Sequence, residues 1–293
     1  MMVDDRLART AYERELHKHW EDKTDDPINL LLGKEDGLYH HHYAVGEFDR
    51  RVLLSDPTIR EQRILSEMHR LETDQVKLIL DGLGSISASD RILDGGSGRG
   101  GTSFMIHDRF RCHVEGVNFC KHQVQFAQNL SLKRGCESHV KFHHANMCNT
   151  RFRSGSFQAV VTNETTMYVN LVEAFTEFAR LLVPGGRYTG VTWCWNDTAG
   201  GRTEDIDAID RHYVCNINPR SAYFAAMHEA GLVPLRVLDL TKDAIPYWEL
   251  RSASSLRTGV EPYFLSGHRS NRLQYMAFTA ERVHEDEQTL RAN

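Results

Sequence analysis

The segment Arg91–Gly101 has residue types and spacing that could hold a nucleotide-like ligand. A short apolar run ends in Asp94, and glycines follow at positions 95, 96, 98, 100 and 101. Because glycine lacks a Cβ atom, such a turn lets a ligand lie against the backbone and the N–H groups that open the next helix. Glycine-rich strand-to-helix turns bind nucleotides in doubly wound α/β folds. The segment therefore predicts a nucleotide-binding loop, although a purely structural turn has the same composition.

A strand–helix alternation surrounds this loop and would position it. The pattern predicts strands at 91–94, 113–117, 140–143, 157–162 and 186–193, with helices at 101–109, 121–134 and 170–182. Residues 197–232 are predicted to be mainly helical, and two late strands are expected at about 234–240 and 273–282. We therefore expect an α/β fold, a mostly parallel, doubly wound, Rossmann-like sheet with helices on both faces.

The N-terminal third has a different pattern. Residues 5–23 and 56–83 are predicted to form amphipathic helices, separated by a loop region at 29–43 that is rich in aromatic residues and histidine. The predicted organisation is an N-terminal helical lid over residues 1–83 and a core over residues 84–293, with a substrate-pocket insertion at about 197–232. A passive helical extension or an oligomer contact is the alternative role for the first part.

The composition excludes several classes of protein. Hydrophobic residues make up 41% and charged residues 26% of the 293 positions, as in ordinary globular proteins. The net charge of -5 gives no general attraction to nucleic acid or to acidic membranes. No apolar run approaches the roughly 18 residues of a bilayer span, and the charged N-terminus does not resemble a signal peptide. Six cysteines without a CxxC pair predict reduced thiols in a cytoplasmic protein and do not favour a zinc site.

Polar residues at three successive strand ends indicate which nucleotide-like ligand is bound. Each of them is compatible with turn or cap chemistry alone, but their order along one βαβαβ half predicts S-adenosylmethionine and a class I methyltransferase core. A dinucleotide-dependent oxidoreductase would require an acidic residue at the end of the second strand, where this chain has Asn118. The predicted cofactor-binding residues are Asp94, Gly95, Gly96, Gly98, Asn118, Gln123, Asn146 and Met147.

Five further segments carry a family resemblance, at residues 36–43, 69–72, 163–168, 194–196 and 246–251. The Tyr-His-His-His-Tyr run at 39–43 and the Asn-Glu-Thr-Thr-Met-Tyr run at 163–168 are its most specific parts. Over about residues 15–283 the chain resembles the prenyl diphosphate C-methyltransferases. The resemblance implies methylation of an alkene carbon in an isoprenoid diphosphate, geranyl diphosphate first, with isopentenyl or farnesyl diphosphate as alternatives. It also implies Mg²⁺ bound through the diphosphate, and a homo-oligomer.

Methyl transfer to an alkene leaves a tertiary carbocation, which needs aromatic faces, exclusion of water and a base. Glu164 follows the apolar run Phe157–Val161, at the carboxyl edge of the predicted fourth strand, and is the predicted base. A helix cap or an ion-pair partner is its alternative role. The resemblance places the cation-stabilising aromatic residues at Tyr43 and Tyr213, where relatives have phenylalanine at the second position.

The resemblance and the residue types also suggest partners for the substrate. His41, His42, Arg251 and Ser254 are predicted to bind the diphosphate, and Tyr168, Trp195 and Trp248 to line the tail pocket. No residue is assigned as a direct metal ligand, because Mg²⁺ binds largely through substrate phosphates and water. A transition-metal site at His40–His42 is the alternative, but consecutive side chains point in different directions.

Two other functions fit part of the pattern. In an O- or N-methyltransferase, Glu164 or a histidine would deprotonate a hydroxyl, and no diphosphate site would be needed. A non-catalytic cofactor-binding protein would give Asn163 and Glu164 no task at the strand end.

Overall fold

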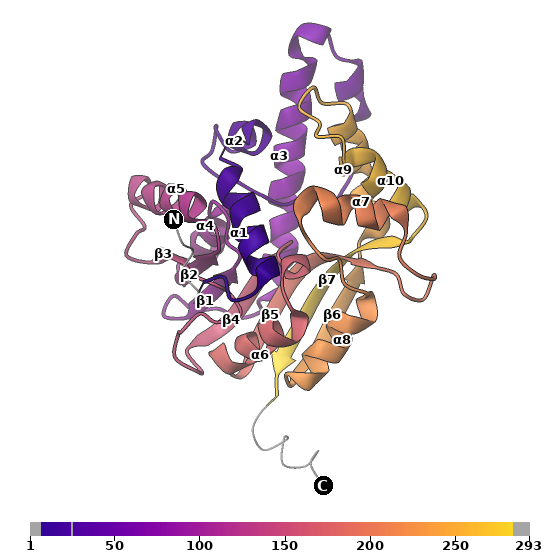
Figure 1. The fold of residues 1–293 in the computed structure, drawn as a ribbon. Coiled ribbons are helices and arrows are strands. Elements are labelled where there is room, and N and C mark those ends of the chain that lie inside the picture. Colours follow the sequence, from indigo (N-terminus) through magenta and orange to yellow (C-terminus); the bar gives the residue numbers. More distant parts are fainter. Residues whose placement is uncertain (1–6, 25, 284–293) are drawn as a thin grey trace.

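A computed structural model of the chain describes residues 7–24 and 26–283. In this part of the chain one sheet has the strand order β3-β2-β1-β4-β5-β7-β6 (Figure 1). All neighbours pair in parallel except β7, which is antiparallel to both β5 and β6. The strands are β1 (Arg91–Gly95), β2 (His113–Asn118), β3 (Val140–His144), β4 (Phe157–Asn163), β5 (Leu182–Trp195), β6 (Leu232–Asp239) and β7 (Leu273–Arg282). The predicted fold class is confirmed.

Helices surround the sheet and extend beyond it at one end, where the long α3 projects away from the sheet (Figure 1). The α-helices are α1 (Ala11–Asp22), α2 (Pro27–Leu32), α3 (Pro57–Gly82), α4 (Gly101–Phe110), α5 (Lys121–Lys133), α6 (Leu171–Leu181), α7 (Glu204–Tyr213), α8 (Arg220–Glu229), α9 (Thr241–Ser252) and α10 (Glu261–Arg269). The 3-10 helices found among the described residues are η1 (Arg50–Leu54) and η2 (Thr166–Tyr168). No helix in the described ranges combines the length and the apolar character that a bilayer crossing requires.

The alternating strand residues bury two separate hydrophobic cores. Ile92 belongs to the core that contains Phe104 of α4, whereas its neighbour Leu93 belongs to the core that contains Phe175 of α6. Successive side chains of a strand point to opposite faces, so a sheet covered by helices on both faces needs apolar residues at odd and at even positions of its strands. This is why the strand segments read as nearly continuous apolar runs.

Several element boundaries differ from the sequence predictions. The helix expected at 5–23 begins at Ala11, because Thr10 and Glu13 form a capping box there. The region 197–232, predicted to be mainly helical, contains two helices, since Val214 ends α7 in the left-handed conformation (φ 53°) and Pro219 precedes α8. The segment Pro246–Phe264, for which we predicted no element, contributes to α9 and α10.

Candidate active site

A cavity of about 250 Å³ lies where the carboxyl ends of β1, β2 and β4 meet the N-terminal segment. The glycine loop and the strand ends form its floor, and side chains of α1 such as Leu16 and Trp20 form the opposite wall. Ligands of open parallel sheets bind at this edge, where the loops after the strands converge. The fold therefore brings most of the predicted site residues together in one cavity.

The glycine loop fits a ligand that lies close to the backbone. Gly96 and Gly98 both line the cavity and have positive φ angles of 84° and 54°. A Cβ atom at Gly96 would lie 2.3 Å from Cγ2 of Thr165, so a larger residue would clash there. Beyond the loop, Asn118 Nδ2 donates to Gln123 Oε1 at 2.8 Å, and both side chains line the cavity. The Asn118 carbonyl and the remaining Gln123 N–H are groups that suit vicinal hydroxyls.

Asp94 and Gly95 lie outside the cavity lining, unlike their predicted partners in the loop. Asp94 is 1% exposed, and its carboxylate accepts a hydrogen bond from Ser103 Oγ at 2.6 Å. Burial raises the pKa of Asp94 to about 6, an effect that the Ser103 hydrogen bond opposes. Asp94 thus ties β1 to α4, and its predicted contact with the cofactor stays a prediction.

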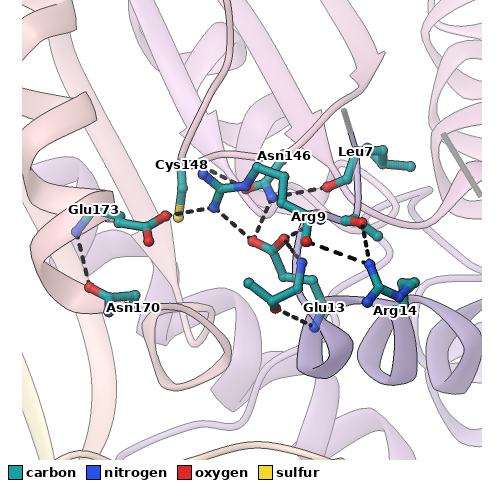
Figure 2. Close-up of polar contacts among 10 residues, drawn as sticks. Leu7, Arg9, Glu13, Arg14, Asn146, Cys148, Asn170 and Glu173 are labelled. Carbon is teal, nitrogen blue, oxygen red and sulfur yellow. Dashed lines mark hydrogen bonds and ion pairs between the residues drawn. The ribbon is translucent and has the colours of Figure 1, made fainter. Parts of the chain in front are cut away.

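Asn146 lines the cavity together with Met147, but its side chain is already engaged by the N-terminal segment. Figure 2 shows Asn146 facing Leu7 and Glu13: its Nδ2 atom donates to Leu7 O and to Glu13 Oε1, each at 3.0 Å. Arg9 extends the contact by pairing with Glu13 at 2.7 Å and with Glu173 of α6 at 2.6 Å. Asn146 therefore holds the beginning of α1 against the core, a role that the sequence did not indicate.

Glu164 is a buried carboxylate of the cavity wall, with 4% of its surface exposed. It follows β4 directly, adopts a left-handed conformation (φ 54°), and donates its N–H to Val191 O at 2.8 Å. A non-glycine residue in this region costs roughly 1–3 kcal/mol and persists only where its surroundings hold it. Oε1 accepts from Tyr43 N at 2.9 Å and from the hydroxyl of Tyr275, whereas Oε2 is buried without a partner in the described structure.

Burial dominates the electrostatics of Glu164. It raises the pKa of this carboxyl to about 7, against the opposing effects of the Tyr275 and Tyr43 hydrogen bonds, of the nearby Trp193 indole N–H and of the Arg251 charge. A pKa near neutrality suits a group that exchanges protons at physiological pH. Both the position and the acidity of Glu164 are therefore compatible with a base.

Aromatic rings enclose the space next to Glu164. Tyr43 and Tyr213 both line the cavity and their hydroxyls are hydrogen-bonded to each other. Each ring also faces a cation of the protein: Arg251 Cζ lies 5.3 Å from the Tyr43 ring centre, and Lys23 Nζ lies 5.6 Å from that of Tyr213. The rings thus have the electrostatic environment of cation-binding faces.

Arg251 is the predicted diphosphate residue that the structure supports most clearly by geometry. It lines the cavity at 3% exposure, and its Nη1 atom has no hydrogen-bond partner in the described structure. Its Nε atom lies 3.3 Å from Glu261 Oε1, which orients the guanidinium. A buried guanidinium with free N–H groups is suited to a phosphate oxygen.

The other predicted diphosphate residues differ from Arg251. Burial lowers the pKa of His41 to about 3 and that of His42 to about 4, so both line the cavity as neutral imidazoles rather than as cations. His41 Nδ1 lies 3.2 Å from Arg99 Nη1, and His42 Nδ1 lies 2.7 Å from Tyr43 O. Ser254 lies outside the cavity lining, because its hydroxyl donates to Glu61 at 2.6 Å.

Of the residues predicted to line the tail pocket, only Tyr168 is part of the cavity wall. Trp248 is 1% exposed and stacks on Phe264 behind Tyr43, with ring centres 3.8 Å apart. Trp195 lies two residues beyond Trp193 on β5, and it is Trp193 that lines the cavity. Residues two apart in a strand share a face, so the predicted residue lies on the same strand face as the cavity residue but beyond the cavity.

Sequence reasoning missed residues whose position depends on distant elements. Lys23, Trp20 and Asp26 come from the N-terminal segment, and Asp26 Oδ2 accepts from Arg99 of the glycine loop at 3.2 Å. Tyr275 reaches Glu164 because β7 pairs with β5, opposite Trp193. An aromatic residue in the middle of a predicted strand was the only available signal for Tyr275, and it is equally typical of a core residue.

Comparison with known proteins identifies the family. Residues 92–186 match the family described as Methyltransferase domain. The geranyl diphosphate 2-C-methyltransferase of Saccharopolyspora erythraea is 44% identical over 94% of this chain and 96% of its own length. A solved geranyl diphosphate methyltransferase in complex with GPP and sinefungin superimposes with a TM-score of 0.90 at 42% identity, covering 94% of this chain and 100% of that one.

The corresponding enzyme of Streptomyces coelicolor A3(2), solved with Mg²⁺, geranyl-S-thiolodiphosphate and S-adenosyl-L-homocysteine, superimposes with a TM-score of 0.91 at 40% identity, over 94% of this chain and 99% of that one. The family resemblance predicted from the sequence is confirmed. With its fold, cavity and sequence in agreement, this chain belongs to the geranyl diphosphate 2-C-methyltransferase family.

Proposed function

We propose that this protein transfers the methyl group of S-adenosylmethionine to carbon 2 of geranyl diphosphate. The observation that carries the proposal is Glu164, a carboxylate with a pKa near 7 whose Oε2 atom is buried without a partner in an aromatic cavity. The family supports geranyl diphosphate as the substrate. An O- or N-methyltransferase is less compatible, because the cavity also contains the buried guanidinium of Arg251, whose Nη1 atom has no hydrogen-bond partner in the described structure.

The cofactor would lie over the glycine loop. Gly96 and Gly98 leave room for its amino-acid part, and the Asn118–Gln123 pair offers hydrogen bonds to the ribose hydroxyls. S-adenosylmethionine supplies an electrophilic methyl group on a positively charged sulfur. The protein must then hold the substrate alkene in line with that group, because a prenyl alkene is a weak nucleophile.

The reaction on the substrate takes two steps. The π electrons between carbons 2 and 3 form the new carbon–carbon bond at carbon 2 as the sulfur–methyl bond breaks. The electron pair of that bond would stay on sulfur, with S-adenosylhomocysteine as the leaving group, and a tertiary cation would remain at carbon 3. Glu164 then accepts the proton from carbon 2, and the electron pair of that C–H bond restores the double bond. The rings of Tyr43, Tyr213 and Trp193 present π faces to the cation and exclude water that would trap it as an alcohol.

The diphosphate would bind at the cationic side of the cavity. Arg251 and Lys23 both line it, and both face aromatic rings, so a diphosphate between them would neutralise their charge and leave the ring faces to the substrate. The two neutral histidines, His41 and His42, would serve as hydrogen-bonding groups. Mg²⁺ would bind mainly to the phosphate oxygens and water, in keeping with the few carboxylates at this side.

The N-terminal segment would act as the lid. Leu16, Trp20 and Lys23 of this segment close the cavity, and Glu13 fastens α1 to Asn146 (Figure 2). Residues 1–6 of the predicted lid lie outside the described residues. We also infer a cytoplasmic location, supported by six buried free cysteines, which are typical of reducing compartments. The homo-oligomer implied by the resemblance stays a prediction.

The direct test offers the purified protein labelled S-adenosylmethionine, Mg²⁺ and one of three diphosphates of five, ten or fifteen carbons. We expect methylated product from geranyl diphosphate with the highest kcat/KM. Preference for isopentenyl or farnesyl diphosphate would retain the reaction and overturn the substrate. The proposed reaction type would be overturned if the protein methylated a hydroxyl or amine substrate without Mg²⁺ and methylated none of the three diphosphates.

A further inference from the structure

A second cluster of potential ligands lies beside the cavity, at the junction of α1 and β3. His17 and Glu21 are one turn apart on α1, and His144 ends β3. One ligand atom from each of the three residues lies within 4.8 Å of the others, and His17 Nε2 lies 3.8 Å from Glu21 Oε1. None of these residues lines the cavity, so the proposed methyl transfer leaves them without a role.

His17 is partly buried and His144 is exposed, and the hydrogen-bond partners around both rings favour metal binding. His17 Nε2 is buried and has no hydrogen-bond partner in the described structure, although the side chain as a whole is 13% exposed. His144 Nε2 lies 3.2 Å from the carbonyl oxygen of Phe119. A backbone carbonyl that accepts one ring N–H fixes the tautomer and leaves the other nitrogen as a ligand, as in most histidine metal sites.

We propose that His17, Glu21 and His144 bind a divalent transition-metal ion of the zinc class. Two imidazoles and one carboxylate with a water molecule form a common four-coordinate zinc set. Donor atoms in such a site lie about 3.3 Å apart, so the present separations require side-chain movements of about 1 Å. Imidazole ligands favour zinc, copper or nickel over Mg²⁺, which distinguishes this site from the metal that accompanies the diphosphate.

A neighbouring group shares Glu21 but is a poorer candidate. Cys120 and His122 lie near the other oxygen of this carboxylate, with His122 Nδ1 3.7 Å from Glu21 Oε2. The Cys120 sulfur, however, already donates to Trp20 O at 3.5 Å and contacts His122 at 3.1 Å. We therefore assign the metal to the histidine pair, and His122 becomes an internal control.

An ion at this position would connect the proposed lid to the core. Its ligands come from α1 and from the end of β3, and α1 also supplies Leu16 and Trp20 to the cavity wall. Binding to the docked arrangement alone stabilises that arrangement by mass action. Zinc occupancy would therefore hold α1 on the core and slow its opening.

The test is zinc titration of the chelator-treated full chain by calorimetry. We expect one ion per chain and a rise in melting temperature. His17→Ala and His144→Ala should each weaken zinc affinity at least tenfold. Loss of a group that only hydrogen-bonds to a metal ligand already has an effect of about this size. His122→Ala, and His228→Ala on the exposed side of α8, should bind as the wild type does.

Melting temperatures and circular dichroism of the metal-free variants separate loss of a ligand from loss of the fold. Zinc binding that survives in both His17→Ala and His144→Ala, loss of binding in His122→Ala, or no binding by the wild type would each overturn the proposal. Because binding is measured directly, a failure of the methyl-transfer assay does not affect this result.

Discussion

The hydroxyl of Tyr275 donates a hydrogen bond to Oε1 of Glu164, across 111 positions of sequence. The same oxygen accepts the backbone N–H of Tyr43, so both contacts fall on one atom. Oε2 is left as the unpartnered oxygen of a buried carboxyl. A carboxylate base needs one oxygen held in place by hydrogen bonds and one oxygen free to accept the proton. The pairing of β5 with β7 brings Tyr275 to the oxygen that is held.

Replacing Glu164 by glutamine tests the base directly. Glutamine keeps the size of the side chain and an oxygen for the Tyr275 contact, but it cannot accept the proton. We expect kcat to fall by roughly 10²–10⁴-fold, the usual contribution of a general base, with unchanged cofactor affinity. Product formation by mass spectrometry and cofactor binding by calorimetry measure the two effects. Wild-type turnover in Glu164→Gln would exclude this carboxyl as the base.

The pH dependence of the reaction follows from the pKa of Glu164. Burial raises this pKa to about 7. The carboxylate form that can accept a proton therefore predominates above pH 7 and is lost as the pH falls through 7. For one such group, kcat/KM at pH 6 should be about tenfold below its value at pH 8. The profile is measured at low cofactor concentration, where the free enzyme is the reference state. A profile that is flat between pH 6 and 8 would contradict the assignment.

Tyr275→Phe should move this profile. The Tyr275 hydroxyl lowers the pKa of Glu164, so its removal raises that pKa and the rate at pH 6.5 should fall more than the rate at pH 8.5. Tyr247→Phe is the matched control, because Tyr247 is equally buried but donates to Glu72. Parallel losses at both pH values in Tyr275→Phe would indicate a structural role only.

Two substitutions of Tyr213 distinguish the role of its ring from that of its hydroxyl. Tyr213→Phe keeps the π face and loses the hydrogen bond to Tyr43, so we expect turnover close to that of the wild type. Tyr213→Ala removes a face worth roughly 0.5–2 kcal/mol to a cation, which corresponds to about a 2- to 30-fold loss in kcat. An alcohol by-product in Tyr213→Ala, detected by gas chromatography, would indicate water entry. Equal turnover of the two variants would count against cation stabilisation at this position.

Arg251 should act on substrate affinity rather than on the cofactor. Arg251→Gln removes a buried cation with a free Nη1 atom, and the lost charge-assisted hydrogen bond should raise KM for the diphosphate by about 10- to 100-fold. The KM for S-adenosylmethionine should change little. Arg70→Gln is the control, since Arg70 is exposed and pairs with Glu67 and Asp74 on α3. A similar rise of both KM values in Arg251→Gln would point to a general disturbance of the cavity.

Local pattern was sufficient for the sheet and for the cofactor side of the site. The apolar runs and the glycine turn placed β1 through β5 and the residues at their carboxyl ends, because parallel strands put those ends at one edge. Gly96, Gly98, Asn118 and Gln123 all reach the cavity for this reason. Glu164 was also predictable, since its place directly after β4 fixes its location whatever surrounds it.

The partners of those residues were decided by tertiary contacts. Asp94 turns to Ser103 and Asn146 turns to Glu13, and neither choice leaves a mark in the local sequence. The register of β5 against β7 brings Tyr275 to Glu164, and the docking of α1 brings Lys23 to Tyr213. The sequence by itself determined which residues reach the sheet edge, because strand direction and periodicity are local properties. Which atoms of Asn146 and Glu164 remain free for a ligand depended on segments more than a hundred residues away, so only the folded chain decided it.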